Sequence, residues 1–169
     1  VKNLISGEIS LASSNSQGVV ASGTSQNVSI SSDNRYALFE SNASNLVAGD
    51  TNSTWDIFIK DLLTGTITRA STDSSGLQAN GGSYKARLSD DGCYLVFQSD
   101  ATNLVAGDTN GYTDVFLKDL ATGLVTRISI SGAGVQGNYY SANPVISHDN
   151  SYVFFDSGAN NLTPVDFYG

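Results

Sequence analysis

The chain has 169 residues, of which 40% are hydrophobic, and this is enough for one domain with a hydrophobic core. Its formal net charge is −8 and its eight Lys and Arg residues do not cluster, which argues against nucleic acid or an anionic membrane as a partner. Ser, Thr, Asn and Gly supply most of the polar surface, and no stretch has the composition and length of a helix, so short strands joined by tight turns are expected.

A repeat of 58 residues organises the chain. Residues 41–71 and 99–129 are identical at 20 of 31 positions, and the segment NLVAGDTN occurs at 45–52 and again at 103–110. A repeat of this length indicates an architecture built from several copies of one small unit.

The first residues begin in the middle of a repeat. Residues 1–13, VKNLISGEISLAS, match residues 59–71 and predict two strands joined by a tight turn at Gly7. Complete copies are expected at about 26–83 and 84–140, and the remaining copy is split between 141–169 and 1–25. We therefore interpret residues 1–169 as one segment that holds three circularly permuted repeats.

Each copy predicts four strands. The first is short, as in NPVIS (143–147), and a turn such as SDDG leads to YLVFQS (94–99), a continuous apolar run typical of a strand covered on both faces. A long loop carries NLVAGDTN, and the alternating segment DVFLKDL (114–120) follows it. A Thr-Gly turn then leads to LVTRIS (124–129), whose polar character is expected of an outer edge strand.

Two recurring patterns carry a resemblance to a known family. They are S-x-D-[GN]-x-Y-x-x-F, found at 31–39, 89–97 and 147–155, and the strand pair D-[IV]-F-[IL]-K-[DN]-L-x-T-G-x-x-T-R. The chain thus resembles the WD40-like (PD40), TolB-type propeller repeats of bacterial envelope and secreted proteins. The resemblance implies an all-β fold, a β-propeller of four-stranded antiparallel blades with three blades per chain, and six blades in the whole ring.

Three blades cannot close a ring around an axis without severe crowding, so an open arc would expose two blade faces and a strand edge. The split repeat suggests how these surfaces are covered. Residues 1–13 of a second copy could supply the third and fourth strands to a blade that begins at residues 141–158, so that a homodimer closes a six-bladed ring. The alternative is a fragment of a longer six- or seven-bladed chain.

The long loops contain a candidate metal site with the pattern D-x-N-x-x-x-D. Carboxylate and amide oxygens that alternate in a loop are ligands that Ca²⁺ accepts, so calcium is a possible cofactor. The alternative is structural, with the first Asp and the Asn closing turns and the last Asp capping the next strand. The third copy keeps only Asp166. The candidate ligands are Asp50, Asn52, Asp56, Asp108, Asn110 and Asp114.

The same loops contain a candidate ligand site. In a blade of this topology the two long loops lie on one face of the propeller, where aromatic rings beside amide groups could bind a sugar. Packing between neighbouring loops is the alternative, because Gly-x-Gln-x-Asn recurs with the repeat. The candidate residues are Trp55, Gln78, Asn80, Tyr112, Gln136, Asn138, Tyr139 and Tyr140.

These patterns favour a non-catalytic propeller that acts as a recognition or structural scaffold and self-assembles into a closed ring. A carbohydrate-binding, lectin-like propeller is the alternative, and a hydrolase with a site in the central channel is a weaker one. The single histidine, His148, falls in a turn, and no G-x-S-x-G segment is present. The expected partners are a second copy and a glycan or protein, with no nucleic acid.

The composition also bears on location. The chain does not start with Met, so we interpret it as processed or as part of a longer protein. The acidic composition, rich in Ser, Thr and Asn, favours a secreted protein or one of the bacterial cell envelope or periplasm. No apolar stretch approaches the roughly 20 residues of a membrane-spanning helix, so no membrane insertion is expected.

Overall fold

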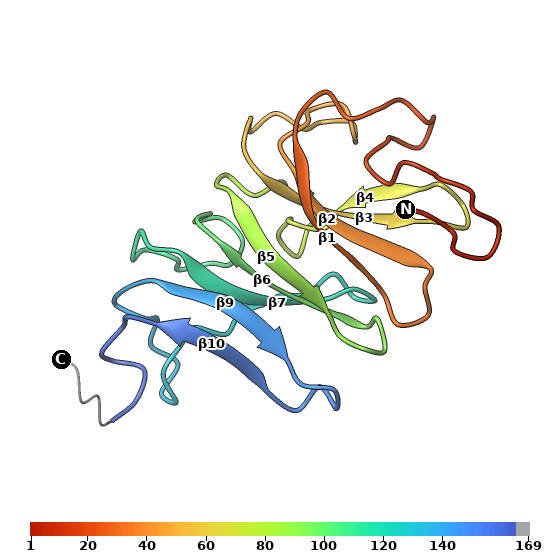
Figure 1. Ribbon diagram of the computed structural model, residues 1–169. Helices are drawn as coiled ribbons and strands as arrows, with labels where there is room; N and C mark the ends of the chain where they lie inside the picture. The colour runs from red at the N-terminus through yellow and green to blue at the C-terminus, as the bar shows by residue number, and fades with distance from the viewer. Residues whose placement is uncertain (165–169) are drawn as a thin grey trace.

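Residues 1–164 form ten strands in three antiparallel sheets that lie side by side (Figure 1). The structure is a computed structural model that describes these residues, and Asp166 with the rest of 165–169 lies outside them. The first sheet has the order β1 (Ser25–Ile30), β2 (Tyr36–Ser41), β3 (Asp56–Asp61) and β4 (Ile67–Arg69). The second has β5 (Ser83–Leu88), β6 (Tyr94–Ser99), β7 (Asp114–Asp119) and β8 (Val125–Arg127), and the third has β9 (Ser141–Ile146) and β10 (Val153–Ser157).

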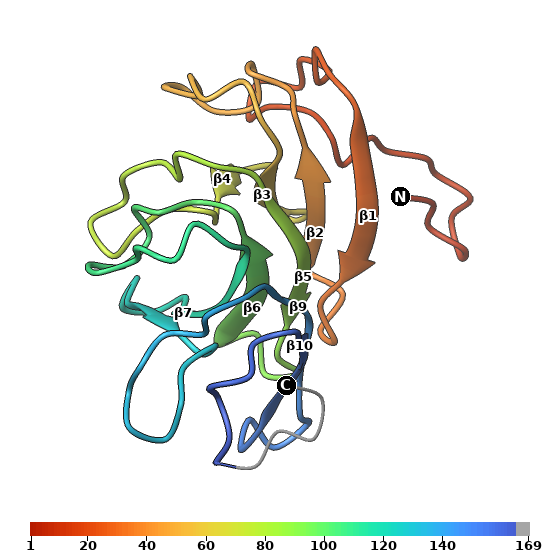
Figure 2. The same cartoon turned by 90° about the vertical axis from the view of Figure 1, so that its left-hand side faces the viewer.

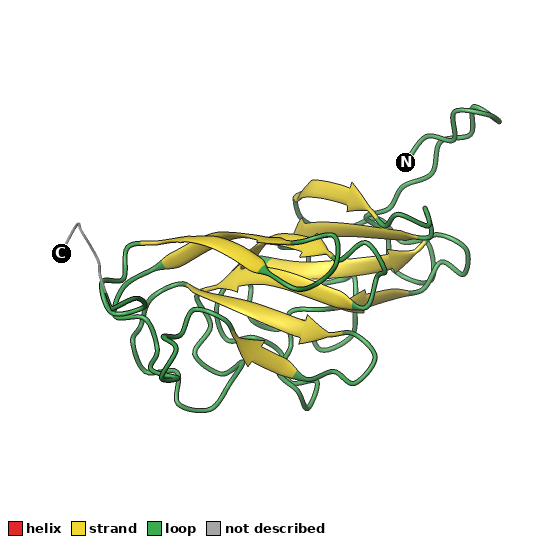
Figure 3. Ribbon diagram, turned by 90° about the horizontal axis from the view of Figure 1, so that it is seen from below, coloured by secondary structure: helices red, strands yellow, loops and turns green. Residues whose placement is uncertain are grey.

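The predicted fold class, an all-β propeller of four-stranded antiparallel blades, is confirmed. The regular secondary structure of the described residues consists of strands, and no helix occurs among them (Figure 3). It follows that this part of the chain has no helix long and apolar enough to cross a membrane. The outer strands β4 and β8 have only three residues each, shorter than LVTRIS predicts, because the pairing with β3 and β7 ends after three residue pairs.

The turns between the first two strands of each blade are built by the same Ser and Asp side chains. The hydroxyl of Ser147 donates to Asp149 at 2.6 Å, and Ser89 donates to Asp91 at the same distance. The backbone N–H of Ser151 then donates to Asp149 at 3.1 Å. These donors favour the ionised carboxylate and lower the pKa of Asp149 to about 2, with the Ser147 hydroxyl as the largest cause.

The core lies between neighbouring sheets as well as within them. Leu38 on β2 belongs to the same buried cluster as Leu95 and Phe97 on β6, although the two strands lie in different blades. Within the second blade, the rings of Phe97 and Phe116 stack with their centroids 5.7 Å apart. The blades are therefore held together by a continuous apolar contact between sheets, and none of them buries its core alone.

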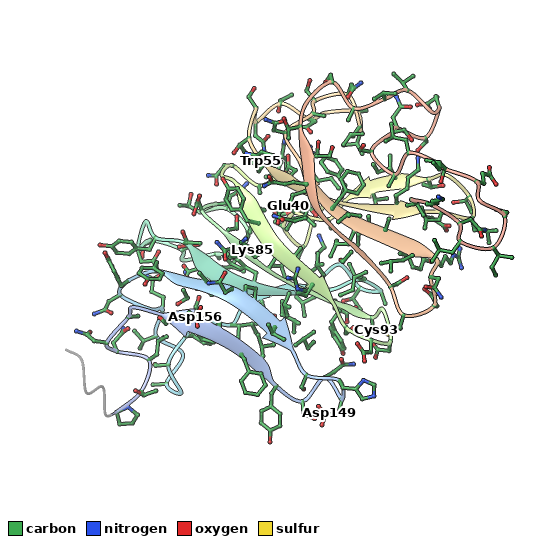
Figure 4. The ribbon with its side chains drawn as sticks, viewed as in Figure 1. Glu40, Trp55, Lys85, Cys93, Asp149 and Asp156 are labelled. Carbon is green, nitrogen blue, oxygen red and sulfur yellow. The ribbon has the colours of Figure 1, made fainter. Side chains whose placement is uncertain are left out.

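A polar contact accompanies the apolar one at each junction. Glu40 on β2 is buried and accepts the backbone N–H of Lys85 on β5 at 2.7 Å, and Figure 4 labels the two residues on neighbouring sheets. Gln98 on β6 accepts the backbone N–H of Asn143 on β9 at 2.8 Å. Lys85 and Asn143 have positive φ angles of 53° and 54°, and each lies where the pairing of its strand shifts register. The bulge turns the N–H of each residue toward the preceding blade.

The two ends of the row of sheets lie far apart, with the N-terminus beside the first sheet and residue 164 beside the third (Figures 1 and 2). Residues 1–24 join none of the three sheets and form isolated bridges at Lys2–Ile9 and Ser14–Val20. The third sheet has two strands among the described residues, so the edge of β10 opposite β9 lacks a partner strand there.

Replacing Lys85 with Asn is expected to stabilise the fold. A lysine with positive φ is strained, whereas Asn, which occupies the equivalent position at 143, tolerates that conformation and keeps the N–H donor. We expect the free energy of unfolding of Lys85→Asn to rise by about 0.5–1 kcal/mol, measured by urea denaturation at fixed protein concentration. Lys85→Ala is the matched control, because it removes the same side chain without the tolerance of Asn. An equal gain in both variants would show that the strain is not the cause.

Candidate functional site

The first D-x-N-x-x-x-D loop folds around the first residue of β3. The carboxylate of Asp56 accepts the Ser71 hydroxyl at 2.6 Å on one oxygen and the Asn52 amide at 3.1 Å on the other. The amide of Gln78 donates to Asp50 at 2.9 Å, so a residue from the next long loop reaches into the cluster. The structure thus brings together three candidate metal ligands and one candidate sugar ligand.

An arginine supplies the positive charge of this cluster. Nη1 of Arg69, on β4, lies 3.5 Å from Asp50 Oδ1 and 4.0 Å from Asp56 Oδ2. All three side chains are at most 10% exposed. Arg69 is not among the predicted site residues. The signal that could have found it is the recurrence of Arg69 and Arg127 at equivalent positions of the repeat, one for each pair of aspartates.

The second loop repeats the arrangement with one difference. Asp114 accepts Asn110 at 3.0 Å and Arg127 Nη1 at 3.2 Å. The same Nη1 atom lies 3.0 Å from Asp108 Oδ1, but neither oxygen of Asp108 accepts a directed hydrogen bond from residues 1–164. Gln136 donates to the hydroxyl of Thr109 at 2.7 Å instead of to the carboxylate, so the contact of Asp108 in this cluster is with Arg127.

Burial sets the protonation of these carboxylates. Desolvation raises the pKa of Asp56, and the Ser71 hydroxyl and the Arg69 charge oppose it. Desolvation also raises the pKa of Asp108, helped by the charge of Asp114 and opposed by Arg127. Arg69 and Arg127 therefore oppose the effect of burial on the pKa of Asp56 and of Asp108.

The observed contacts of both loops are those of the structural alternative. Asn52 and Asn110 turn their amide N–H groups, not their oxygens, toward the carboxylates. Within residues 1–164, no three His, Cys, Asp or Glu side chains gather as a metal-binding group. Calcium binding stays a prediction, and a cation entering the first loop would have to displace Arg69 from the carboxylates it contacts.

The candidate amides of the long loops bind neighbouring loops. Asn80 donates to Thr102 at 2.9 Å, and Asn138 donates to Asn160 at 2.6 Å, in each case from the loop that enters a blade to the loop that follows the second strand of that blade. Gln78 accepts the backbone N–H of Thr51 at 3.2 Å in addition to its bonds with Asp50 and Asp56. These side chains align successive long loops.

Three candidate tyrosines form a cluster of rings at the second junction. The centroid of Tyr139 lies 4.8 Å from that of Tyr112 and 5.1 Å from that of Tyr140, and the three side chains are 43–46% exposed. Trp55 is half-buried on the first blade and is not part of this cluster. Tyr139 and Tyr140 take the positions that Gly81 and Gly82 occupy one repeat earlier, so the cluster interrupts the repeat.

The ends of the row expose apolar surface that the sequence analysis expected without naming its residues. Phe154 on β10 is 63% exposed, whereas its counterparts Leu38 and Val96 in the other two blades are 1% and 0% exposed. At the opposite end, a groove of about 450 Å³ lies between residues 11–13 and the first sheet. The residues that line it include Val1, Leu11, Ala12, Val28, Ile30, Ala37 and Phe39.

No protein-family model and no curated protein matches the chain, but solved structures do. The crystal structure of the tricorn protease has a TM-score of 0.50 at 13% identity, over 79% of this chain and 11% of that one. A putative TolB from Agrobacterium tumefaciens has a TM-score of 0.48 at 17% identity, over 80% of this chain and 43% of that one. TolB from Acinetobacter baumannii has a TM-score of 0.44 at 15% identity, over 79% and 37%.

The chain spans less than half the length of each of these proteins. Tricorn protease is a β-propeller protein, and at 13% identity the likeness to it concerns the fold alone. Together with the antiparallel four-stranded sheets, it defines the chain as a β-propeller protein. The narrower assignment to the WD40-like (PD40) repeats stays a prediction.

Replacing Arg127 with Met is expected to destabilise the fold strongly near neutral pH, because it leaves buried Asp108 and Asp114 without their cation. The free energy of unfolding should fall by about 3 kcal/mol at about pH 7. Burial raises the folded-state pKa of Asp108 above its usual range, and the pKa rises further without the opposing charge of Arg127. The loss should therefore shrink as the pH falls toward about 4, where the folded protein binds more protons than the unfolded chain does.

Urea denaturation over a pH series measures this effect. Arg35→Met is the control, because the Arg35–Asp61 pair is more exposed and its loss should cost far less than the loss of Arg127. A deficit in Arg127→Met that does not change with pH would contradict a role for the buried carboxylates.

Proposed function

We propose that this chain is a non-catalytic propeller module, a structural or recognition scaffold, that completes its ring by self-assembly. The observation that carries the proposal is the exposure of Phe154, because both of its counterparts are buried and one of them, Leu38, lies in a cluster with residues of the next blade. Phe154 occupies a position that is buried in the other two blades, so packing of a further blade against it would be stabilising.

The other end of the row supports the same conclusion. Val28 and Ile30 on β1 are 67% and 51% exposed, whereas Ala86, the counterpart of Val28 on β5, is buried against the first blade. Burying such side chains stabilises an assembly by about 1.5–3 kcal/mol each. Two chains of three blades would bring together both kinds of end and make a ring of six.

The solution mass tests this proposal. We expect the protein to have about twice its chain mass of 17.7 kDa, measured by size-exclusion chromatography with light scattering over a dilution series. Dissociation on dilution should be accompanied by an increase in the binding of a dye that reports exposed apolar surface. A monodisperse species of one chain mass at every concentration would refute self-assembly.

A carbohydrate ligand is a second candidate, favoured by the tyrosine cluster. Tyr112, Tyr139 and Tyr140 present partly exposed rings on the long-loop face, and Asn138 lies beside Tyr139 in the same loop. Aromatic rings with nearby amides suit the apolar faces and hydroxyl groups of sugars. Tyr139 and Tyr140 stand where the earlier copies have Gly81 and Gly82 and, before them, Gly23 and Thr24, so both tyrosines are found at this junction only.

A glycan array tests the second candidate. We expect binding that falls at least about tenfold in Tyr139→Ala, because one stacking ring is lost. Trp55→Ala is the control and should bind like the unchanged protein, since Trp55 lies outside the tyrosine cluster. Equal loss in both variants, or no binding by the unchanged protein, would count against a sugar site at the tyrosines.

The proposed location is outside the cytoplasm, in the cell envelope or secreted. The support comes from the composition, with a net charge of −8 and a polar surface made of Ser, Thr and Asn.

A further inference from the structure

The apolar groove at the first blade reproduces the surroundings of Leu38, with the central residue missing. At the junction of the first two blades, Leu38 is buried in a cluster that includes Ala70, Ala86, Leu95 and Phe97. The residues 58 positions before these four all line the groove, namely Ala12, Val28, Ala37 and Phe39. The groove is therefore a blade junction from which the second strand of the preceding blade is absent.

The residue that matches this groove is Phe154. It stands two repeats after Leu38, at the same position of the second strand, and it is 63% exposed. Phe154 on β10 and the groove beside β1 lie at opposite ends of the row of sheets, so one chain does not bring them together (Figures 1 and 2). A second copy can supply Phe154 to the groove.

Residues 1–10 already have the hydrogen bonds of a third and fourth strand. Lys2 pairs with Ile9 as Lys118 pairs with Val125 in the second blade. The backbone N–H of Asn3 donates to Glu8 at 2.8 Å, and that of Gly7 donates to Asn3 at 2.9 Å. Bonds of 2.9 and 2.8 Å occur between the equivalent residues of the second blade. The N-terminal hairpin is thus a preformed half-blade that lies apart from the three sheets.

The repeat also fixes the register in which this hairpin would pair with β10. In the first two blades, the equivalent lysine of the third strand lies opposite Ala37 and Leu95 of the second strand. The third residue of this series is Val153 on β10, so Lys2 of a second copy would lie opposite Val153. The same count places Asn3 opposite Tyr152.

A polar contact closes the series. Glu40 and Gln98 each accept the backbone N–H that lies 45 positions later, in the next blade. Asp156 is their exposed counterpart on β10 and lies on the third sheet in Figure 4. Its matching donor, counted through the repeat, is Asn27 of a second copy, which is exposed on β1 with a φ of 52°.

We propose that a second copy of this chain binds at each end of the arc. Phe154 of one copy fills the groove of the other, whose residues 1–10 complete the β9–β10 sheet as its third and fourth strands. Asp156 accepts the N–H of the other copy's Asn27. This arrangement rests on the self-assembly proposed above and specifies its contacts, and two-fold symmetry makes each contact occur twice.

Substitution of Phe154 tests the groove contact. Phe154→Asp places a charge in an apolar groove, and we expect it to raise the dissociation constant of the dimer at least about 100-fold, measured by light scattering on dilution. Leu63→Asp is the matched control, because Leu63 is 80% exposed at the tip of the β3–β4 turn, and it should change the constant less than about threefold. Because Phe154 is exposed in the single chain, the variant should keep its strand content by circular dichroism.

Cysteine pairing tests the register independently. Opposed residues of antiparallel strands lie close enough for a disulfide, so Lys2→Cys with Val153→Cys should give a covalent dimer on oxidation. The free thiol of Cys93 is first removed by Cys93→Ser. Leu63→Cys with Val153→Cys is the control and should stay largely uncoupled.

The outcomes separate this arrangement from self-assembly in general. A dimer that withstands Phe154→Asp and does not couple Lys2→Cys to Val153→Cys would overturn the arrangement and leave self-assembly in place. A stable monomer would overturn both. A dimer that Phe154→Asp dissociates, and that the cysteine pair couples, supports both.

Discussion

Burial of one apolar side chain of each second strand against the next blade is the contact on which the rest of this structure depends. Leu38 and Val96 are almost completely buried in this way, and the cluster around Leu38 takes residues from two sheets. A single four-stranded sheet of this size has one thin apolar layer and is not stable in isolation. The core therefore forms only where two blades pack against each other. Each end of the row has one side of such a contact without the other.

The polar bond beside this contact explains why the blades stack in one register. Glu40 and Gln98 accept an N–H that a bulge in the next blade directs toward them, at residues with positive φ. A sliding of one blade along another would leave buried Glu40 without this donor. The buried carboxylates of the long loops lie close by, at the first residue of each third strand, where Arg69 and Arg127 connect the loop to the outer strand.

The repeat made the fold predictable, because Tyr, Phe, Asp and Gly recur at positions with one role each, as in the turns of Asp91 and Asp149. The candidate site was less predictable. Asp56 and Asn52 are residue types that suit a bound cation as well as hydrogen bonds within the loop. Arg69, whose charge decides between these two roles, lies on β4 and outside the D-x-N-x-x-x-D motif. Exposure of Phe154 depends on the absence of a neighbouring blade, which residue types do not record.

The two unlike ends of the row have a consequence for the size of the particle. Two copies whose ends fit one another can form both contacts at once, which gives a closed dimer. If each pair of copies forms only one contact, further copies can add and the assembly grows into a filament. The angle between successive sheets selects between these products, and the bulge at Lys85 and Asn143 helps to set it. A substitution that removed this bulge would change the angle between sheets, and the same end surfaces would then join copies into a filament instead of a closed pair.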